Sequence, residues 1–192
     1  TLGASSATVA DLNGDGRPEV IFANWYNGST HNLNSYIYWG QAGGPYGVQY
    51  SASARTDLPT SGADGVAVAD LNGDARPEVI FANYRNDSTF NVNSYIYWGQ
   101  AGGPYGVQYS AGARTNLPTS SATDVAVADL NGDGRPEVIF ANWYNGSTHN
   151  LNSYIYWGQA GGPYGVQYSA GARTNLPTSG ADGVTVADLN GD

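Results

Sequence analysis

Acidic and amide side chains alternate with small residues in a motif that returns at a fixed spacing. Residues 11–20 read DLNGDGRPEV, residues 70–79 read DLNGDARPEV, residues 129–138 repeat the first form, and DLNGD ends the sequence at 188–192. Positions 1, 3 and 5 of each full motif offer side-chain oxygens, position 7 a backbone carbonyl and position 9 a carboxylate. Ca²⁺ accepts six to eight such oxygens, whereas Mg²⁺ demands stricter octahedral geometry. The spacing therefore predicts calcium-binding loops, in which glycine lets the chain curl around the ion.

The motif is not an EF-hand, and one alternative to a calcium site comes from the same residues. An EF-hand would need a glutamate at position 12, where Phe22 stands, and helices on both sides. Asp and Asn also form Asx turns that need no metal. The crowding of charge favours a cation, because 11 of the 16 carboxylates lie in DLNGD-type sequences and like charges repel unless they are neutralised.

Short apolar segments surround the motif and predict strands. Residues 65–69, 19–23, 35–40 and 46–50 are rich in β-branched and aromatic side chains. Residues 24–34 are expected to form a polar and aromatic loop, 41–45 a turn, and 54–60 a connection to the next unit. Four short strands in each 59-residue period describe a β-propeller blade. We therefore predict an all-β chain of three blades, each with four antiparallel strands. A tandem array of immunoglobulin-like domains is the alternative, although the period is short for that fold.

The motif and the later sequence YIYWG resemble FG-GAP (VCBS-type) repeats, which form the propeller of integrin α-subunits and of some propeller lectins. The resemblance implies a calcium-binding loop in each repeat and an extracellular or cell-surface location. In that family position 9 is usually Asp, and this chain has Glu. The implied metal ligands are Asp11, Asn13, Asp15, Arg17 (carbonyl) and Glu19; Asp70, Asn72, Asp74, Arg76 and Glu78; and Asp129, Asn131, Asp133, Arg135 and Glu137.

The period divides the chain into five segments. These are an N-terminal strand at 1–10, repeats at 11–69, 70–128 and 129–187, and the truncated start of a fourth repeat at 188–192, whose loop is expected to be weak or empty. Repeats 11–69 and 129–187 differ at three positions only, which fits recent duplication or deliberate consensus design.

Three blades are too few for a ring of four to eight. We therefore predict a homo-oligomer that closes the ring, a six-bladed dimer being favoured over a nine-bladed trimer.

Composition excludes several classes of protein. The net charge of −9 and the seven basic residues argue against nucleic-acid binding. Thiolate metal sites and disulfides are excluded because there is no cysteine. No apolar run is long enough to predict a membrane helix, and no signal peptide is present. The missing Met predicts a processed chain or a piece of a longer protein.

The aromatic loop after the second strand is the candidate ligand site. Its mixture of rings, amides and hydroxyls suits a carbohydrate, and it is where the repeats differ most, so a propeller lectin is the alternative function. The alternative for the loop itself is that the rings pack between blades and the amides hold turns. We do not predict an enzyme, because no nucleophile–base arrangement is present. The candidate ligand-binding residues are Trp25, Tyr26, Asn27, Tyr84, Arg85, Trp143, Tyr144 and Asn145, and the tryptophans expected in the core are Trp39, Trp98 and Trp157.

Overall fold

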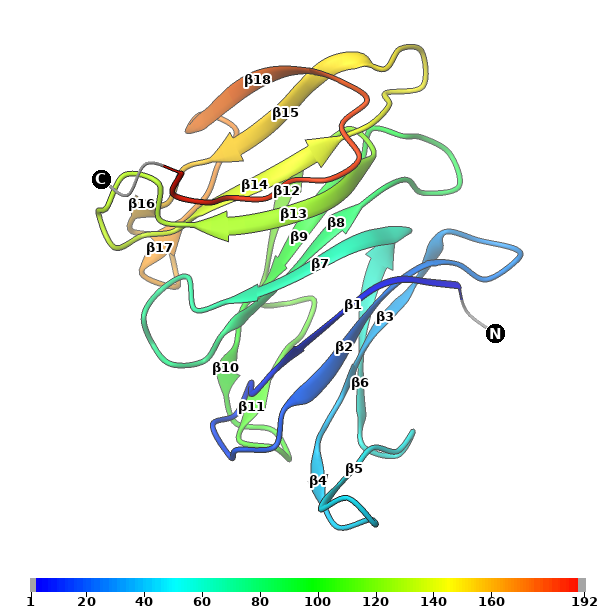
Figure 1. The fold of residues 1–192 in the computed structure, drawn as a ribbon, viewed down its shortest axis with the longest axis vertical. Helices are drawn as coiled ribbons and strands as arrows, with labels where there is room; N and C mark the ends of the chain where they lie inside the picture. Colours follow the sequence, from blue (N-terminus) through cyan, green and yellow to red (C-terminus); the bar gives the residue numbers. More distant parts are fainter. Residues whose placement is uncertain (1–2, 190–192) are drawn as a thin grey trace.

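The computed structural model describes residues 3–189, which contain strands, turns and bends but no helix. Its main elements are three four-stranded antiparallel sheets, each a blade (Figure 1). Blade 1 contains, in spatial order, β1 (Gly3–Ala10), β2 (Glu19–Tyr26), β3 (Asn32–Tyr38) and β6 (Arg55–Ser61). Blade 2 contains β7 (Ala63–Ala69), β8 (Glu78–Asn83), β9 (Asn93–Tyr97) and β12 (Arg114–Pro118). Blade 3 contains β13 (Ala122–Ala128), β14 (Glu137–Asn142), β15 (Asn150–Tyr156) and β18 (Arg173–Ser179).

Each blade also carries a two-stranded hairpin between its third and fourth strands. The hairpins are β4 (Gln41–Ala42) with β5 (Val48–Gln49), β10 (Gln100–Ala101) with β11 (Val107–Gln108), and β16 (Gln159–Ala160) with β17 (Val166–Gln167). No membrane-spanning helix is found in residues 3–189. Asn190, Gly191 and Asp192, which belong to the predicted truncated loop, lie outside the described residues.

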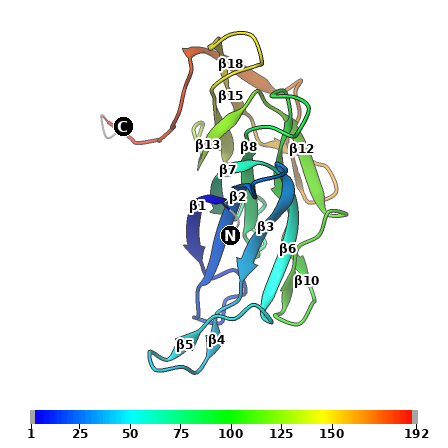
Figure 2. The ribbon, with the colours of Figure 1, turned by 90° about the vertical axis from the view of Figure 1, so that its right-hand side faces the viewer.

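The first strands of successive blades lie side by side, and the blades fan out from them (Figures 1 and 2). β1 contacts β7, and β7 contacts β13. Residues 181–189 continue this series as an extended segment beside β13. The Ala181 N–H donates to the Asn142 carbonyl at 3.1 Å, and the Val184 N–H donates to Asp124 Oδ2 at 3.0 Å. The segment therefore takes the place of the first strand of a fourth blade.

The position of the fourth strand corrects the sequence prediction. Residues 46–50 were expected to form it, but Val48–Gln49 only pairs with Gln41–Ala42. The fourth strand is β6, which pairs with β3 from Tyr38 opposite Arg55 to Asn32 opposite Ser61. Pro59 made this segment look like a connection. A proline is tolerated here because β6 is the outer strand, where a missing N–H breaks no ladder hydrogen bond. The predicted loop 24–34 is also shorter, since β2 extends to Tyr26 and β3 begins at Asn32.

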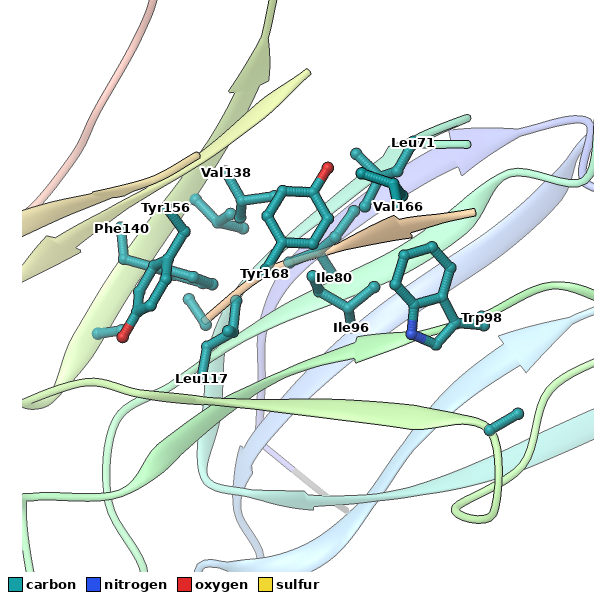
Figure 3. Close-up of a cluster of buried hydrophobic side chains, with 14 residues drawn as sticks. Leu71, Ile80, Ile96, Trp98, Leu117, Val138, Phe140, Tyr156, Val166 and Tyr168 are labelled. Atoms are coloured by element: carbon teal, nitrogen blue, oxygen red, sulfur yellow. The ribbon is translucent and has the colours of Figure 1, made fainter. Parts of the chain in front are cut away.

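The core lies between blades, because alternate side chains of each strand face opposite neighbours. In β8, Val79 and Phe81 pack against blade 1, whereas Ile80 packs against blade 3. All three side chains are fully buried. Figure 3 shows the cluster between blades 2 and 3, to which blade 2 contributes Trp98 and Leu117 and blade 3 contributes Phe140 and Tyr156. Each blade thus needs a neighbour on both faces to bury its apolar residues.

Two of the three tryptophans expected in the core are buried. Trp39 stacks on Tyr105 with ring centroids 4.5 Å apart, and Trp98 stacks on Tyr164 at the same separation. In both pairs the tyrosine comes from the hairpin of the next blade. Trp157 is only half-buried, because no further blade packs on it within residues 3–189.

Candidate metal-binding loops and aromatic loops

The three acidic loops join the first and second strands of each blade and lie at the same end of the molecule (left in Figure 1). In the first loop Asp11 Oδ1 accepts from the N–H groups of Gly14 at 2.8 Å and Asp15 at 3.2 Å, while Asp11 Oδ2 accepts from Gly16 at 2.8 Å. Asn13 Oδ1 accepts from Asp15, and Asp15 Oδ1 from Arg17. The same bonds recur in the other two loops. The loop therefore wraps around its own three oxygen-bearing side chains.

An arginine supplies a positive charge at the rim of every loop. The Arg17 guanidinium forms an ion pair with Asp15, with 2.7 Å between Nη2 and Oδ2. Arg76 pairs with Asp74 at 2.7 Å and Arg135 with Asp133 at 2.6 Å. Each pair is partly exposed, so its attraction is weakened by water. One oxygen of the position-5 carboxylate is thus already paired with the arginine of its own loop.

The backbone after the loop packs tightly on a glycine at the end of the third strand. A Cβ atom on Gly40 would lie 2.8 Å from both the Arg17 and the Pro18 carbonyl oxygens. Tyr50 Oη donates to the Pro18 carbonyl at 2.8 Å. The equivalent contacts recur around Gly99 and Gly158. The glycine of the sequence YIYWG is therefore required by this close approach, which fixes the position-7 carbonyl.

The position-9 glutamate lies beneath the loop rather than at its rim. Glu19 is fully buried; its Oε2 accepts from the Leu12 N–H at 2.7 Å, and its Oε1 accepts from the Gly40 N–H at 3.3 Å. Burial raises the pKa of Glu19, and the nearby Asp15 and Asp11 carboxylates raise it further. Glu19 therefore ties the base of the loop to the end of β3.

Glu78 is the equivalent of Glu19 in blade 2, but only one of its two carboxylate oxygens accepts a hydrogen bond. Its Oε2 accepts from Leu71 at 2.8 Å, but its buried Oε1 has no hydrogen-bond partner among residues 3–189. The Gly99 N–H is near enough to lower the pKa of Glu78 but falls short of hydrogen-bond geometry. Burial nevertheless raises this pKa to about 8, and Asp74 and Asp70 add to the shift. A nearby cation would lower this pKa and favour the charged carboxylate.

The donor chemistry of the loops fits a hard cation. Asp11 Oδ2 and Asp15 Oδ1 each accept one backbone hydrogen bond and keep a second lone pair, so these two oxygens can bind an ion while holding the loop. In residues 3–189 no three His, Cys, Asp or Glu side chains converge as a metal site by themselves. This follows from the loop's composition, because position 3 is an amide, position 7 a carbonyl, and Glu19 is turned toward backbone N–H groups.

The aromatic loops lie at the opposite end of the blades (right in Figure 1). Tyr26 lies 4.6 Å from His31 and Tyr144 lies 4.7 Å from His149, centroid to centroid. The Arg85 Cζ atom lies 4.3 Å from the centre of the Phe90 ring. Tyr144 also packs on Phe90 of the neighbouring loop, with ring centroids 5.0 Å apart. These predicted ligand-binding residues therefore pack within their own loops and, for Tyr144, between blades.

Asparagines of the same loops hold turns. Asn27 Oδ1 accepts from the N–H groups of Ser29 and Thr30, both at 3.0 Å. Asn145 forms the same pair of bonds with Ser147 and Thr148. Their side-chain oxygens are thus occupied by the backbone.

The remaining predicted residues, Trp25, Tyr84 and Trp143, come together around an open hollow of about 420 Å³. Sequence reasoning missed the other side chains of its lining, which are Ser5, Asp64, Thr123 and Asp182. These four share one repeat position, 59 residues apart. One signal in the sequence could have identified them. Every copy of this position is polar, although a largely apolar segment follows it in the sequence.

Comparison with known proteins finds one family and one relative. The family described as FG-GAP-like repeat matches three overlapping segments, residues 11–81, 70–140 and 129–192. Cartilage acidic protein 1 of Mus musculus is 26% identical over 162 residues, which cover 84% of this chain and 24% of that protein. The chain thus spans about a quarter of the length of this relative.

Proposed function

Because this chain belongs to the FG-GAP-like repeat family, we propose that it is a calcium-binding blade module that assembles with further copies of itself. The assembled propeller would serve as a scaffold or interaction surface, and the proposal includes no catalytic step. The observation that carries it is the exposure of two complementary apolar faces, one at each end of the row of blades.

The face of blade 3 that lacks a neighbour is apolar. Leu12 and Leu71 are 0% and 1% exposed, whereas the equivalent Leu130 is 41% exposed. Leu176 is also 41% exposed, although its equivalents in blades 1 and 2 are fully buried. These leucines have the same sequence surroundings in all copies, so the difference comes from the missing fourth blade.

Blade 1 exposes the opposite face. Its Val20, Phe22 and Tyr38 line an open groove of about 670 Å³. The equivalent residues of blade 2, Val79, Phe81 and Tyr97, are fully buried against blade 1. The groove is therefore the surface that receives a preceding blade.

A second copy of the chain offers the matching face for this groove. Blade 3 of one copy would pack on blade 1 of the next as blade 2 packs on blade 3 within the chain. Tyr46, which is 92% exposed, would then stack on Trp157 of the other copy, as Tyr105 stacks on Trp39. Such head-to-tail contacts close into a ring if the rotation permits. Two copies give six blades, within the usual four to eight, and three give nine, so we favour the dimer over the trimer.

In such a ring, β1 of one copy and the segment 181–189 of the other would occupy the same position. The extended segment 181–189 lies where β1 of the next copy would lie. Residues 181–187 (ADGVTVA) and 4–10 (ASSATVA) are similar in sequence. We propose that one of the two strands is displaced on closure, or that the segment pairs with β2 of the next copy.

Calcium would bind at the acidic loops. The supporting observations are the inward-facing oxygens of Asp11, Asn13 and Asp15 and the orphaned oxygen of Glu78. Asp and Asn side chains with the Arg17 carbonyl would hold the ion, and Glu19 would support the loop from beneath. The bound ion would lower the repulsion within each loop and so stabilise the blade. An extracellular location fits this role, and the relative is an acidic protein of cartilage by its name.

Light scattering with calcium, and then with excess EDTA, tests both parts. Since the chain has a mass of 20.1 kDa, we expect a particle of about 40 kDa and a melting temperature that falls in EDTA. Asp11→Asn combined with Asp70→Asn and Asp129→Asn should remove the calcium effect, while Asp57→Asn should keep it. Asp57 is a suitable control because blades 2 and 3 carry Asn at the same position, Asn116 and Asn175. A 20 kDa particle at every concentration would contradict self-assembly, and indifference to EDTA would contradict the calcium site. A glycan array with the same protein tests the alternative prediction of a carbohydrate ligand.

A further inference from the structure

The hollow beside the first strands of the three blades is built from two repeat positions. One position lies on β1, β7, β13 and the extended segment 181–189, and the other lies at or just after the ends of β2, β8 and β14. The first set is Ser5, Asp64, Thr123 and Asp182, and the second is Trp25, Tyr84 and Trp143. The lining therefore consists of an inner arc of hydroxyl and carboxylate groups and an outer arc of aromatic rings.

The inner arc carries uncompensated negative charge. Asp64 is partly buried and accepts a hydrogen bond from Ser5 Oγ. Burial raises the pKa of Asp64, and the neighbouring Asp182 and Asp124 carboxylates raise it further. No basic side chain lines the hollow. Arg85, which follows Tyr84 in the sequence, instead lies over Phe90 and donates to the Asn86 carbonyl at 3.0 Å.

The hydroxyl groups of the arc are already engaged. Thr123 Oγ1 donates to the carbonyl of Ala181 at 3.0 Å and lies 3.3 Å from that of Ala141, and Ser5 is bonded to Asp64. What remains for a ligand is the carboxylate oxygens and the ring surfaces. A neutral sugar would leave the charge unpaired, and a hydrated metal ion would make no use of the rings.

We propose that this hollow binds a compact organic ammonium ion, such as a quaternary amine. The carboxylates of Asp64 and Asp182 would attract the charge, and the rings of Trp25, Tyr84 and Trp143 would contact the alkyl groups by cation–π interaction. A volume of about 420 Å³ is in the range of small-molecule sites. All lining residues come from one chain, so the site goes beyond the proposed assembly. It is a site of the single chain, because displacement of β1 or of segment 181–189 on ring closure would remove Ser5 or Asp182 from it.

Choline and its uncharged isostere 3,3-dimethylbutan-1-ol are the probes that test the charge. Titration of the full chain, followed by tryptophan fluorescence and calorimetry in EDTA, should give a choline dissociation constant of about 1 mM and at least a tenfold weaker interaction with the alcohol. Asp64→Thr with Asp182→Thr should weaken choline binding by about tenfold or more. Thr is the residue of blade 3 at this position, so the fold has a precedent for it.

Two further variants make the result decisive. Tyr84→Leu should weaken choline binding through loss of the ring, which keeps the test valid if the double variant fails to fold. Asp57→Asn, on the outer strand β6, is the control for loss of a carboxylate outside the hollow and should bind choline as the unmodified chain does. Equal binding of choline and the alcohol, an unchanged constant in both variants, or no binding of choline would overturn the proposal.

Discussion

Replacement of Tyr46 by Ala tests the head-to-tail interface with an internal standard. Tyr46 is 92% exposed in the single chain, whereas its equivalents Tyr105 and Tyr164 stack on tryptophans of the preceding blade. We expect Tyr46→Ala to leave the stability of one chain unchanged, because the side chain makes few contacts there. Tyr105→Ala removes the same side chain from an interface inside the chain and should destabilise it at any protein concentration.

The size of the effect follows from the area that the ring would bury. An aromatic side chain buries about 150–250 Å², and burial stabilises by about 25 cal/mol per Å². Tyr105 and Tyr164 stay partly exposed, so about half of this gain applies, or about 2 kcal/mol. Stacking adds about 1 kcal/mol, which gives about 3 kcal/mol for each interface. A two-chain ring contains the interface twice, so its dissociation constant should rise by about 10⁴-fold.

Sedimentation velocity over a wide range of concentration measures that shift. At a concentration where the unmodified chain is fully dimeric, Tyr46→Ala should sediment as a monomer. Its melting temperature should equal that of the unmodified chain diluted until it is monomeric. Tyr105→Ala should instead lower the melting temperature by roughly 6–12 °C, since about 3 kcal/mol corresponds to this shift in a domain of such size. The reasoning fails if Tyr46→Ala assembles like the unmodified chain, or if it destabilises the monomer as Tyr105→Ala does.

Three further substitutions test the local structure by thermal or denaturant unfolding. Gly99→Ala should destabilise the chain by about 1–3 kcal/mol, because its Cβ would lie 2.7 Å from the Arg76 carbonyl; Gly112→Ala is the control, since Ser53 occupies that repeat position, and equal effects would contradict the packing argument. Ala75→Gly should stabilise by about 1 kcal/mol, because Ala75 has a φ of 62° where Gly16 stands in blade 1; a loss of stability would show that chain entropy outweighs the strain. Ser94→Ala should cost about 1–3 kcal/mol, because the buried Ser94 Oγ accepts from the Asn83 N–H at 3.1 Å, and a neutral result would mean that this N–H finds another partner.

The blade and its acidic loop could be predicted because they are local. The 59-residue period fixes the number of units, and the alternation in segments such as 19–23 fixes the inner strands. The order of residues also places the acidic loop and the aromatic loop at opposite ends of a strand. These are consequences of chain connectivity, which a sequence contains in full.

The outer strand and the role of Glu19 could not be predicted because they depend on neighbours. Pro59 can lie within a strand because β6 is the outermost strand of its sheet. The direction of the Glu19 carboxylate is decided by the N–H groups of Leu12 and Gly40, the second of which is 21 residues away. The side chain of Glu is one methylene longer than that of Asp, which lets the carboxylate reach these groups.

The exposed faces connect the repeat to the proposed assembly. The repeats are nearly identical in sequence. A difference in burial between equivalent residues is therefore caused by the place of their blade in the row. Leu58 and Leu117 are buried while Leu176 is 41% exposed, although all three follow the same Arg-Thr-Asp/Asn sequence. Every blade carries apolar residues on the faces that receive a neighbour. Where the row of blades ends, such a face has no neighbour and its apolar surface is exposed. In the proposed assembly, a second chain would cover both exposed ends with contacts that the structure already contains twice, between blades 1 and 2 and between blades 2 and 3.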